Sequence, residues 1–313
     1  MRTFFAILLI VNLFYGFFIP NKQNNVDFKQ TKNLDLLFLV EPESKSQLKF
    51  SKDNNLQTYV IFYQNFFVKD EEFNEEMLKK QIEIKFPDVN SKGFAVLDWE
   101  GKALKSFQKQ EDPKLVEYYK GEFLAAIRFA KKLRPNVKWG FYHLNYLNYS
   151  GTVQGYKSQN DKLIPIVQEV DFLAPSLYVY NPGLLHNMGN QNYIKNKLLQ
   201  ALQYGYQYNK PVYPFIWNRT TSKDEDKNFS LVPVEYFAQV VKLINETTYK
   251  NYRAKGVFWW HSEGYTYRNI NKLKAVKTEY SKINSTSKNT KNPTDYQYQM
   301  FNDYFQSIEQ YVK

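Results

Sequence analysis

Cysteine is absent from the chain and histidine is scarce. The 313 residues include only His143, His186 and His261 as histidines. Without Cys there can be no disulfide, no thiol nucleophile and no cysteine-based metal site. The three histidines lie far apart and form no HExxH pair, so we expect no metal and no other cofactor.

Glycine-rich phosphate-binding motifs are also missing. No GxGxxG or GxxxxGK[ST] segment follows any strand-like run, which removes the main support for a nucleotide-binding open sheet. Acidic residues are in deficit: 42 Lys and Arg face 31 Asp and Glu, a formal charge of +11. This excess favours polyanionic partners, although a compositional bias toward Lys explains it equally well. We find no basic stripe interleaved with aromatics, so we expect no nucleic-acid partner.

Only one long hydrophobic run is present, over residues 4–18 (FFAILLIVNLFYGFF). It follows a cationic start and is shorter than the roughly 20 residues that span a bilayer as a helix. We therefore interpret residues 1–20 as a secretory signal peptide and expect a secreted protein. The alternative is a retained, uncleaved anchor, which is the only membrane association that we consider.

Apolar runs of strand length alternate with helical patterns along the chain. This alternation predicts parallel strands joined by helical crossovers, and seven or eight such units favour a distorted (β/α) TIM-like barrel over an open sheet. We assign residues 21–283 to a catalytic barrel, and 284–313 to a polar linker and a C-terminal helix or tail. The expected strands are 36–40, 58–63, 93–98, 139–144, 170–178, 212–217 and 256–260. The expected helices are 75–84, 114–133, 193–208, 234–244 and 296–312.

Two carboxylates follow the strand expected at 93–98, in the segment Asp98-Trp99-Glu100. Chemistry in a barrel takes place at the carboxyl ends of the strands. If the strand pleat continues, Asp98 and Glu100 point the same way, and two close carboxylates in a partly apolar site separate their pKa values. Such a pair suits acid/base catalysis. The alternative is an ordinary strand end, solvated or paired with Lys102 or Lys105.

Aromatic side chains end four other expected strands. They occur in the segments Trp139–Tyr142, Pro175–Tyr178, Pro214–Trp217 and Trp259–Ser262. Rings in these positions suit the binding of sugar faces, so we count Trp217 among the candidate substrate contacts. Each ring taken alone fits a place in the core just as well.

Several segments, in this order, resemble the hyaluronidases of animal tissues and venoms. The first are FYQNFF near Phe62, FAVLDWE at 94–100 and KKLRPNVKWGFY at 131–142. The others are APSLYVYN at 174–181, KPVYPFIWNR at 210–219 and GVFWWHS at 256–262. The resemblance spans roughly residues 35–265. It implies a distorted barrel that hydrolyses β-linked N-acetylhexosaminides in hyaluronan or a related anionic glycosaminoglycan.

The resemblance also implies roles for individual residues. Glu100 matches the family's proton donor, and Asp98 matches the carboxylate that orients the 2-acetamido group of the substrate. The residues that match the family's substrate contacts are Tyr142, Tyr178, Trp260 and Ser262. The sequence departs from the family at 101–104, where GKAL replaces a Trp-Arg-Pro element, and it lacks the family's disulfides.

Other functions stay open. A chitinase-like barrel is one, but chitinases carry a longer Asp-x-x-Asp-x-Asp-x-Glu run, and Gly93 and Val96 stand in its first two acidic positions. A muramidase-like barrel is another, although its Gly-x-Tyr-His segment precedes the carboxylates, whereas Gly140–His143 follows them. A non-catalytic binder of acidic polysaccharide is a third, and we expect a monomer in each case.

The position of the two carboxylates also indicates a mechanism. An ordinary retaining glycosidase places its two carboxylates about 5–5.5 Å apart, on opposite sides of the scissile bond. Asp98 and Glu100 are expected to leave one strand toward one side. No other strand end offers an obvious nucleophile, so the 2-acetamido oxygen of the substrate is expected to attack the anomeric carbon. Hydrolysis would then retain the anomeric configuration.

Overall fold

The computed structural model describes residues 33–180, 188–286 and 293–313. The apolar run interpreted as a signal peptide lies outside these residues. Among the described helices, none is long and apolar enough to cross a membrane.

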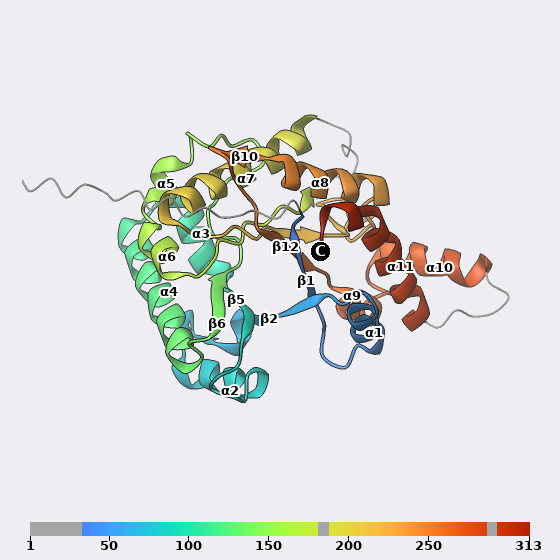
Figure 1. Ribbon diagram of the computed structural model, residues 1–313, viewed down its shortest axis with the longest axis horizontal. Coiled ribbons are helices and arrows are strands. Elements are labelled where there is room, and N and C mark those ends of the chain that lie inside the picture. Colours follow the sequence, from blue (N-terminus) through green and yellow to red (C-terminus); the bar gives the residue numbers. More distant parts are fainter. Residues whose placement is uncertain (1–32, 181–187, 287–292) are drawn as a thin grey trace, which may run out of the picture. The chain divides into compact units, whose positions relative to one another are not determined.

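Six parallel strands form the central sheet in the order β6-β5-β2-β1-β12-β8, with helices around it (Figure 1). The strands are β1 (Asp35–Leu39), β2 (Gln57–Tyr63), β5 (Gly93–Asp98), β6 (Val137–Phe141), β8 (Phe215–Trp217) and β12 (Gly256–Trp260). Isolated parallel bridges, Tyr142 with Ala174 and Ser176 with Phe215, connect the two outer strands through the segment 172–176. The backbone pairing therefore runs around a curled, barrel-like sheet, and the predicted TIM-like fold is confirmed.

The helices follow the strands along the chain. They are α1 (Lys45–Asp53), α2 (Glu75–Lys85), α3 (Gly101–Lys109), α4 (Pro113–Leu133), α5 (Lys157–Asp161), α6 (Ile164–Glu169), α7 (Met188–Tyr208), α8 (Val234–Glu246), α9 (Glu263–Arg268), α10 (Lys274–Thr286) and α11 (Pro293–Ile308). Short strands pair as β3 (Val68–Lys69) with β4 (Glu72–Phe73), β7 (Val179–Tyr180) with β9 (Thr220–Thr221), and β10 (Thr248–Tyr249) with β11 (Tyr252–Arg253). Single 3₁₀ turns cover Gln64–Phe66 and Glu309–Tyr311.

Alternation along the strands divides the core into two layers. On β1, Leu37 and Leu39 belong to an inner cluster, whereas Leu36 and Phe38 belong to the cluster between the sheet and the helices. Gly140 on β6 admits the ring of Phe172 into the interior, because a Cβ at this position would lie 2.5 Å from that ring. Side chains thus fill the barrel, as the fold requires.

The strand expected at 170–178 is the main error in the predicted elements. This segment contributes isolated bridges, and a two-residue strand, β7, begins only at Val179. Pro175 lacks an N–H and cannot donate to a continuous ladder, although its carbonyl accepts from Phe215 N at 2.8 Å. Pro214 has the same effect on the strand expected at 212–217, which begins at Phe215.

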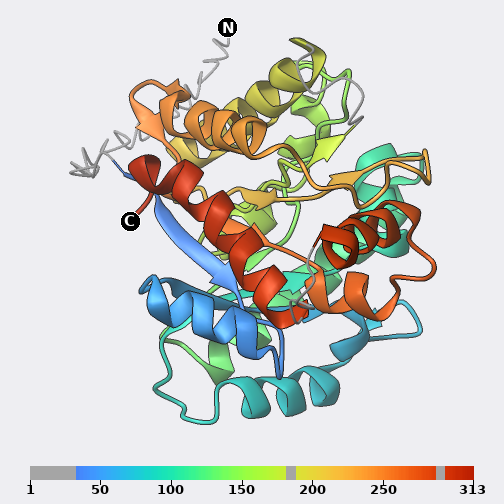
Figure 2. The same ribbon diagram turned by 90° about the vertical axis from the view of Figure 1, so that its right-hand side faces the viewer.

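The C-terminal helix packs on the barrel. α11 contacts α1 and α8, its Phe301 is buried in the main core, and Val312 bridges to Leu34 beside β1 (Figure 2). The segment expected as a linker, 284–294, includes the end of α10 and the start of α11. Its residues 287–292 lie outside the described part of the chain.

Candidate active site

A cavity of about 350 Å³ lies where the central strands end. Its lining includes six of the seven predicted site residues. They are Asp98, Glu100, Tyr142, Tyr178, Trp217 and Trp260. Five of them end or follow a strand, and Tyr178 comes directly before β7. The structure therefore brings together side chains that are up to 162 residues apart in the sequence, between Asp98 and Trp260.

Asp98 is the last residue of β5 and the more deeply buried of the two carboxylates. Its Oδ1 is buried without a hydrogen-bond partner among the described residues. Burial, and then the neighbouring charge of Glu100, raise the pKa of Asp98 well above its usual range. Asp98 therefore holds its proton to higher pH than an ordinary aspartate does.

Glu100 reaches the cavity from a turn and not from a strand. β5 ends at Asp98, and Glu100 is the N-terminal cap residue of α3, so the expected continuation of the pleat is wrong. The Glu100 N–H donates to Gln64 Oε1 at 3.1 Å, which fixes the turn against the end of β2. Between the two acids, Trp99 turns into the core, where its ring stacks on Phe123 of α4 at 4.9 Å.

No cation neutralises the two acids. Neither carboxylate forms an ion pair with Lys102, Lys105 or any other cation among the residues described. Burial also raises the pKa of Glu100. The alternative of a strand end paired with lysine does not apply, and the raised pKa of Glu100 favours a protonated acid at higher pH than usual.

Aromatic rings form a wall of the same cavity. Tyr178 stacks on Trp260 with ring centres 5.5 Å apart, and Trp217 meets Trp260 edge-on at 4.9 Å. Trp260 Nε1 donates to the hydroxyl of Tyr63 at 3.1 Å. The Tyr142 hydroxyl donates to Ser176 Oγ at 3.1 Å, which holds it at the cavity edge. These bonds fix the rings as a preformed apolar surface.

Ser262 is the one predicted site residue that does not line the cavity. It occupies the N-terminal cap position of α9, is 6% exposed, and its Oγ has no hydrogen-bond partner among the described residues. Its role as a substrate contact stays a prediction.

The cavity also contains residues that the sequence did not single out. They are Ile61, Tyr180, Thr221, Asn228 and Phe229. Strand alternation from Tyr178 would have indicated Tyr180. The segment 222–229 has no periodicity, so Asn228 and Phe229 carried no comparable signal.

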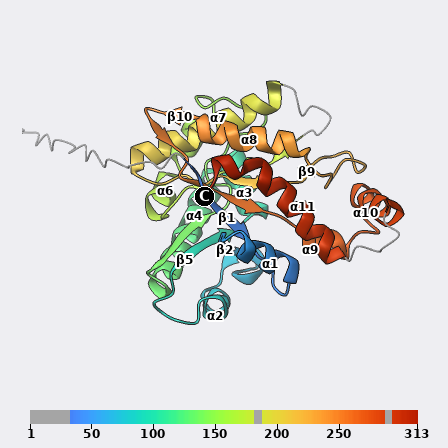
Figure 3. The ribbon, with the colours of Figure 1, turned by 45° about the vertical axis from the view of Figure 1, so that its right-hand side comes forward.

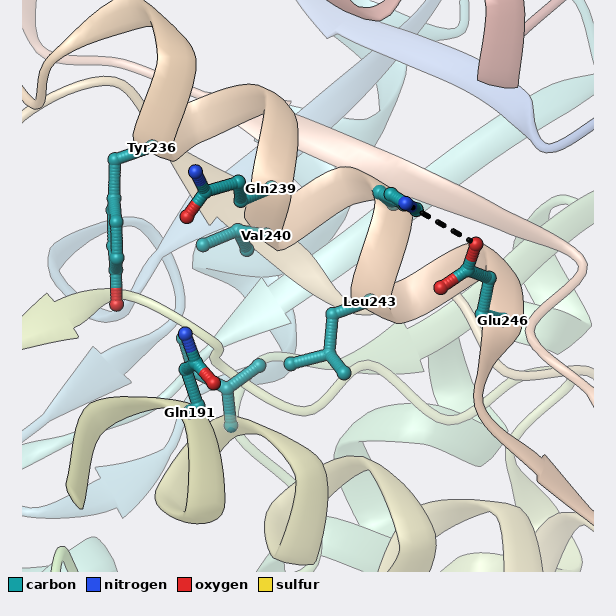
Figure 4. A pocket seen from close by; sticks show the side chains of 8 residues that line it. Gln191, Tyr236, Gln239, Val240, Leu243 and Glu246 are labelled. Atoms are coloured by element: carbon teal, nitrogen blue, oxygen red, sulfur yellow. Dashed lines mark ion pairs between the residues drawn. The ribbon is translucent and has the colours of Figure 1, made fainter. Parts of the chain in front are cut away.

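Other features of the described residues offer less chemistry. No group of three or more His, Asp or Glu in this part of the chain could hold a metal ion. A groove of about 290 Å³ lies between α7 and α8 (Figure 4). Its one carboxylate, Glu246, pairs with Lys242 at 3.8 Å, so the groove lacks the uncompensated acids of the first cavity.

The fold and this cavity define a class: a (β/α) barrel with paired acids and an aromatic wall at its strand ends. Comparison with known proteins shows that the chain is similar to hyaluronidases. The chain is 22% identical to the hyaluronidase Tab y 2.0101 of Tabanus yao over 224 residues. This match covers 60% of the chain and 61% of that protein.

Solved structures give the same likeness in fold. Bee venom hyaluronidase superimposes with a TM-score of 0.57 at 15% identity, over 80% of this chain and 97% of that one. Its complex with a hyaluronic acid tetramer also gives 0.57, at 16% identity, over 80% and 95%. No family model matches the sequence. The likeness to hyaluronidases predicted from the sequence motifs is thus confirmed.

Proposed function

We propose that this chain is a glycoside hydrolase that cleaves β-linked N-acetylhexosaminides in hyaluronan or a related glycosaminoglycan. One observation carries the proposal: half-buried Asp98 and the more exposed Glu100, which pair with no cation among the described residues, line one cavity with aromatic rings at the strand ends of a barrel. The likeness to hyaluronidases, one of them solved with a hyaluronic acid tetramer, supports the choice of polymer.

The charge of the cavity determines which ring of the polymer is held at the cleavage point. The residues that line the cavity in the described part of the chain include no Lys or Arg. A uronic acid carboxylate placed beside Asp98 and Glu100 would find no partner and would meet like charge. The neutral N-acetylhexosamine is therefore the ring held at the cleavage point, and the uronic acids lie outside the cavity.

Glu100 is the proton donor in this proposal. Its raised pKa keeps it protonated at higher pH than an ordinary glutamate, so it can give its proton to the glycosidic oxygen as the bond breaks. The resulting carboxylate then takes a proton from the incoming water. Glu100 thus acts first as an acid and then as a base.

Asp98 orients the 2-acetamido group. Its buried Oδ1 has no hydrogen-bond partner among the described residues, and a substrate amide N–H would supply a donor. Accepting that bond favours the ionised form, so substrate binding lowers the pKa of Asp98. The acetamido oxygen then attacks the anomeric carbon, the glycosidic C–O bond breaks, and water opens the cyclic intermediate with overall retention.

The aromatic residues hold the sugar for this attack. The hydroxyl of Tyr142 or Tyr178 would fix the acetamido carbonyl, and Trp260 would form the wall against the acetamido methyl group. Trp217 extends the same wall. These residues orient the acetamido group toward the anomeric carbon, and such orientation contributes a large part of the rate enhancement.

The direct test is incubation of the purified chain with hyaluronan, chondroitin, chitin and peptidoglycan. We expect new reducing ends from hyaluronan or chondroitin. Cutting of chitin or peptidoglycan alone would favour the chitinase-like or muramidase-like alternative, and binding without any cutting would favour a non-catalytic binder.

The mechanism has a separate test. De-N-acetylated hyaluronan should resist cleavage even where it binds, and NMR should detect the β anomer in the first-formed reducing ends. Efficient cutting of the de-N-acetylated polymer, or an early α anomer, would contradict it.

We also propose that the chain is exported and that it is a monomer. The run at residues 4–18 supports export, and the structural relatives named above are venom proteins. Secretion of the chain by a host cell, with the N-terminus read by mass spectrometry, tests the first. Light scattering of the secreted protein tests the second.

A further inference from the structure

The aromatic wall of the cavity continues outward to the protein surface. Trp260 meets Trp217, Trp217 meets Phe229 at 5.5 Å between ring centres, and Phe229 meets Tyr265 at 5.9 Å. Phe229 lines the cavity, whereas Tyr265 on α9 is 47% exposed. The first two rings suffice for one sugar, so the outer pair, Phe229 and Tyr265, has no part in the proposed cleavage.

The backbone of Phe229 is held in an unfavourable conformation. Its φ is +64°, in the left-handed region that a bulky side chain rarely adopts. Two hydrogen bonds maintain it: its N–H donates to Thr220 O at 3.0 Å, and its carbonyl accepts from Arg219 Nη1 at 2.8 Å. Strain of this kind in a cavity wall indicates a functional constraint.

The same arginine also fixes the helix that carries Tyr265. The Arg219 guanidinium is fully buried and forms two hydrogen bonds to Glu263, the first residue of α9, at 2.7 and 2.8 Å. It forms two more to Glu279 on α10, at 2.8 and 3.0 Å. We refer to Arg219, Glu263 and Glu279 as the Arg219 cluster. β9, α9 and α10 lie on one side of the barrel (Figure 3).

The neighbouring tyrosine on α9 shows that exposure alone does not explain this arrangement. Tyr267 is 44% exposed, but its ring packs on Tyr280 of α10 at 5.7 Å and not on the rings that line the cavity. Among the described residues, Tyr265 is the exposed ring that extends the row from Trp260. An exposed ring fixed next to a binding cavity offers apolar area at little entropic cost.

We propose that Phe229 and Tyr265 form a further sugar-binding subsite, which stacks a pyranose ring adjacent to the one cleaved. The C–H faces of a pyranose are apolar and match an aromatic surface, while its hydroxyls stay in water. Asn228, which also lines the cavity, lies next to Phe229 in the sequence and provides a polar group at the junction. This subsite rests on the proposed function, because its ligand is the next ring of the same polymer.

The test compares Tyr265→Ala with Tyr267→Ala in the full chain, using hyaluronan oligosaccharides of increasing length. Tyr265→Ala should raise KM for an octasaccharide by about tenfold, with kcat and the KM of the shortest cleaved oligosaccharide nearly unchanged. Tyr267→Ala should leave all of these constants unchanged. Phe229→Ala should also raise KM for the octasaccharide, which guards against a local defect in α9.

Two outcomes would overturn the subsite. One is a Tyr265→Ala variant that matches the wild type at every length, and the other is an equal KM change for short and long substrates. Calorimetric titration with the octasaccharide separates this failure from failure of the proposed function. If the wild type cleaves hyaluronan but Tyr265→Ala binds it equally well, only the subsite is wrong. If the wild type neither cleaves nor binds it, both proposals are wrong.

Discussion

Two groups of carboxylates in this protein differ in their partners. Asp98 and Glu100 face the cavity without any cation, and burial raises the pKa of both. In the Arg219 cluster, burial would raise the pKa of Glu263, but the guanidinium of Arg219 holds it below its usual value. A buried acid with a fixed cation becomes a permanent charge that serves structure, whereas one without a cation keeps a proton available for chemistry.

The largest expected effect follows from removing the available proton. Glu100→Gln keeps the size of the side chain but cannot donate, so kcat on hyaluronan should fall by about 10²–10⁴-fold. Binding of the polymer, measured by calorimetry, should persist. Glu169→Gln, which removes a surface partner of Arg128, is the matched control and should retain full turnover. A folded Glu100→Gln variant with near wild-type kcat would show that Glu100 is not the acid.

Stability should respond in opposite directions at the two sites. Glu263→Gln leaves part of a buried guanidinium without its partner and should lower the free energy of unfolding by about 3 kcal/mol. Asp98→Asn removes a carboxyl whose ionisation the fold opposes. It should raise the free energy of unfolding at neutral pH by on the order of 1 kcal/mol for each unit of pKa displacement. Urea denaturation of both variants measures the two changes in the free energy of unfolding. Changes of the same sign would contradict the contrast between the two sites.

The pH dependence of these changes has a defined sign. Folding raises the pKa of Asp98. The increase in the free energy of unfolding on Asp98→Asn is therefore complete at pH values above the pKa of Asp98 in the folded protein. It disappears below the pKa of an aspartate in the unfolded chain, about 3.9. The pKa of Glu263 is lowered on folding. Its contribution is therefore full above the unfolded pKa and is lost as pH falls through the folded one.

The smallest expected effect concerns the net charge of +11. Because no Lys or Arg is among the described residues that line the cavity, we expect attraction to an anionic polymer to come from cations outside it. The apparent affinity for hyaluronan should fall severalfold as the Debye length shrinks from about 10 Å at 0.1 M salt to about 3 Å at 1 M. The affinity for neutral chitin oligosaccharides should barely change. Equal responses would indicate that the charge is compositional only.

Sequence reasoning found the parts of the site that obey strand geometry. Parallel strands end at one rim of a barrel, so the residues that end them could be placed together before the structure was known. Tyr142, Trp217 and Trp260 follow this rule and line the cavity. Tyr178 also lines it, although the strand expected at 170–178 is absent and Tyr178 comes directly before β7. The alternation of elements indicated the barrel for the same reason.

The features that were missed, or predicted by the wrong route as for Glu100, depend on turns and on contacts between distant residues. Glu100 enters the cavity from the start of α3, through a turn fixed by Gln64. Phe229 lies in an aperiodic loop, and its position depends on a backbone conformation that no residue pattern indicates. Arg219 meets acids 44 and 60 residues further along the chain, a pairing that only the folded chain brings about.

The most direct measurement is an NMR titration of the carboxyl carbons of Asp98, Glu100 and Glu263. Variants that remove each carboxyl in turn assign the signals. We expect Asp98 and Glu100 to titrate above their ordinary values and Glu263 below its own, with the alkaline limb of the kcat/KM profile following Glu100. Ordinary or lowered pKa values at both Asp98 and Glu100 would contradict the idea that the absence of a cation prepares this cavity for acid catalysis.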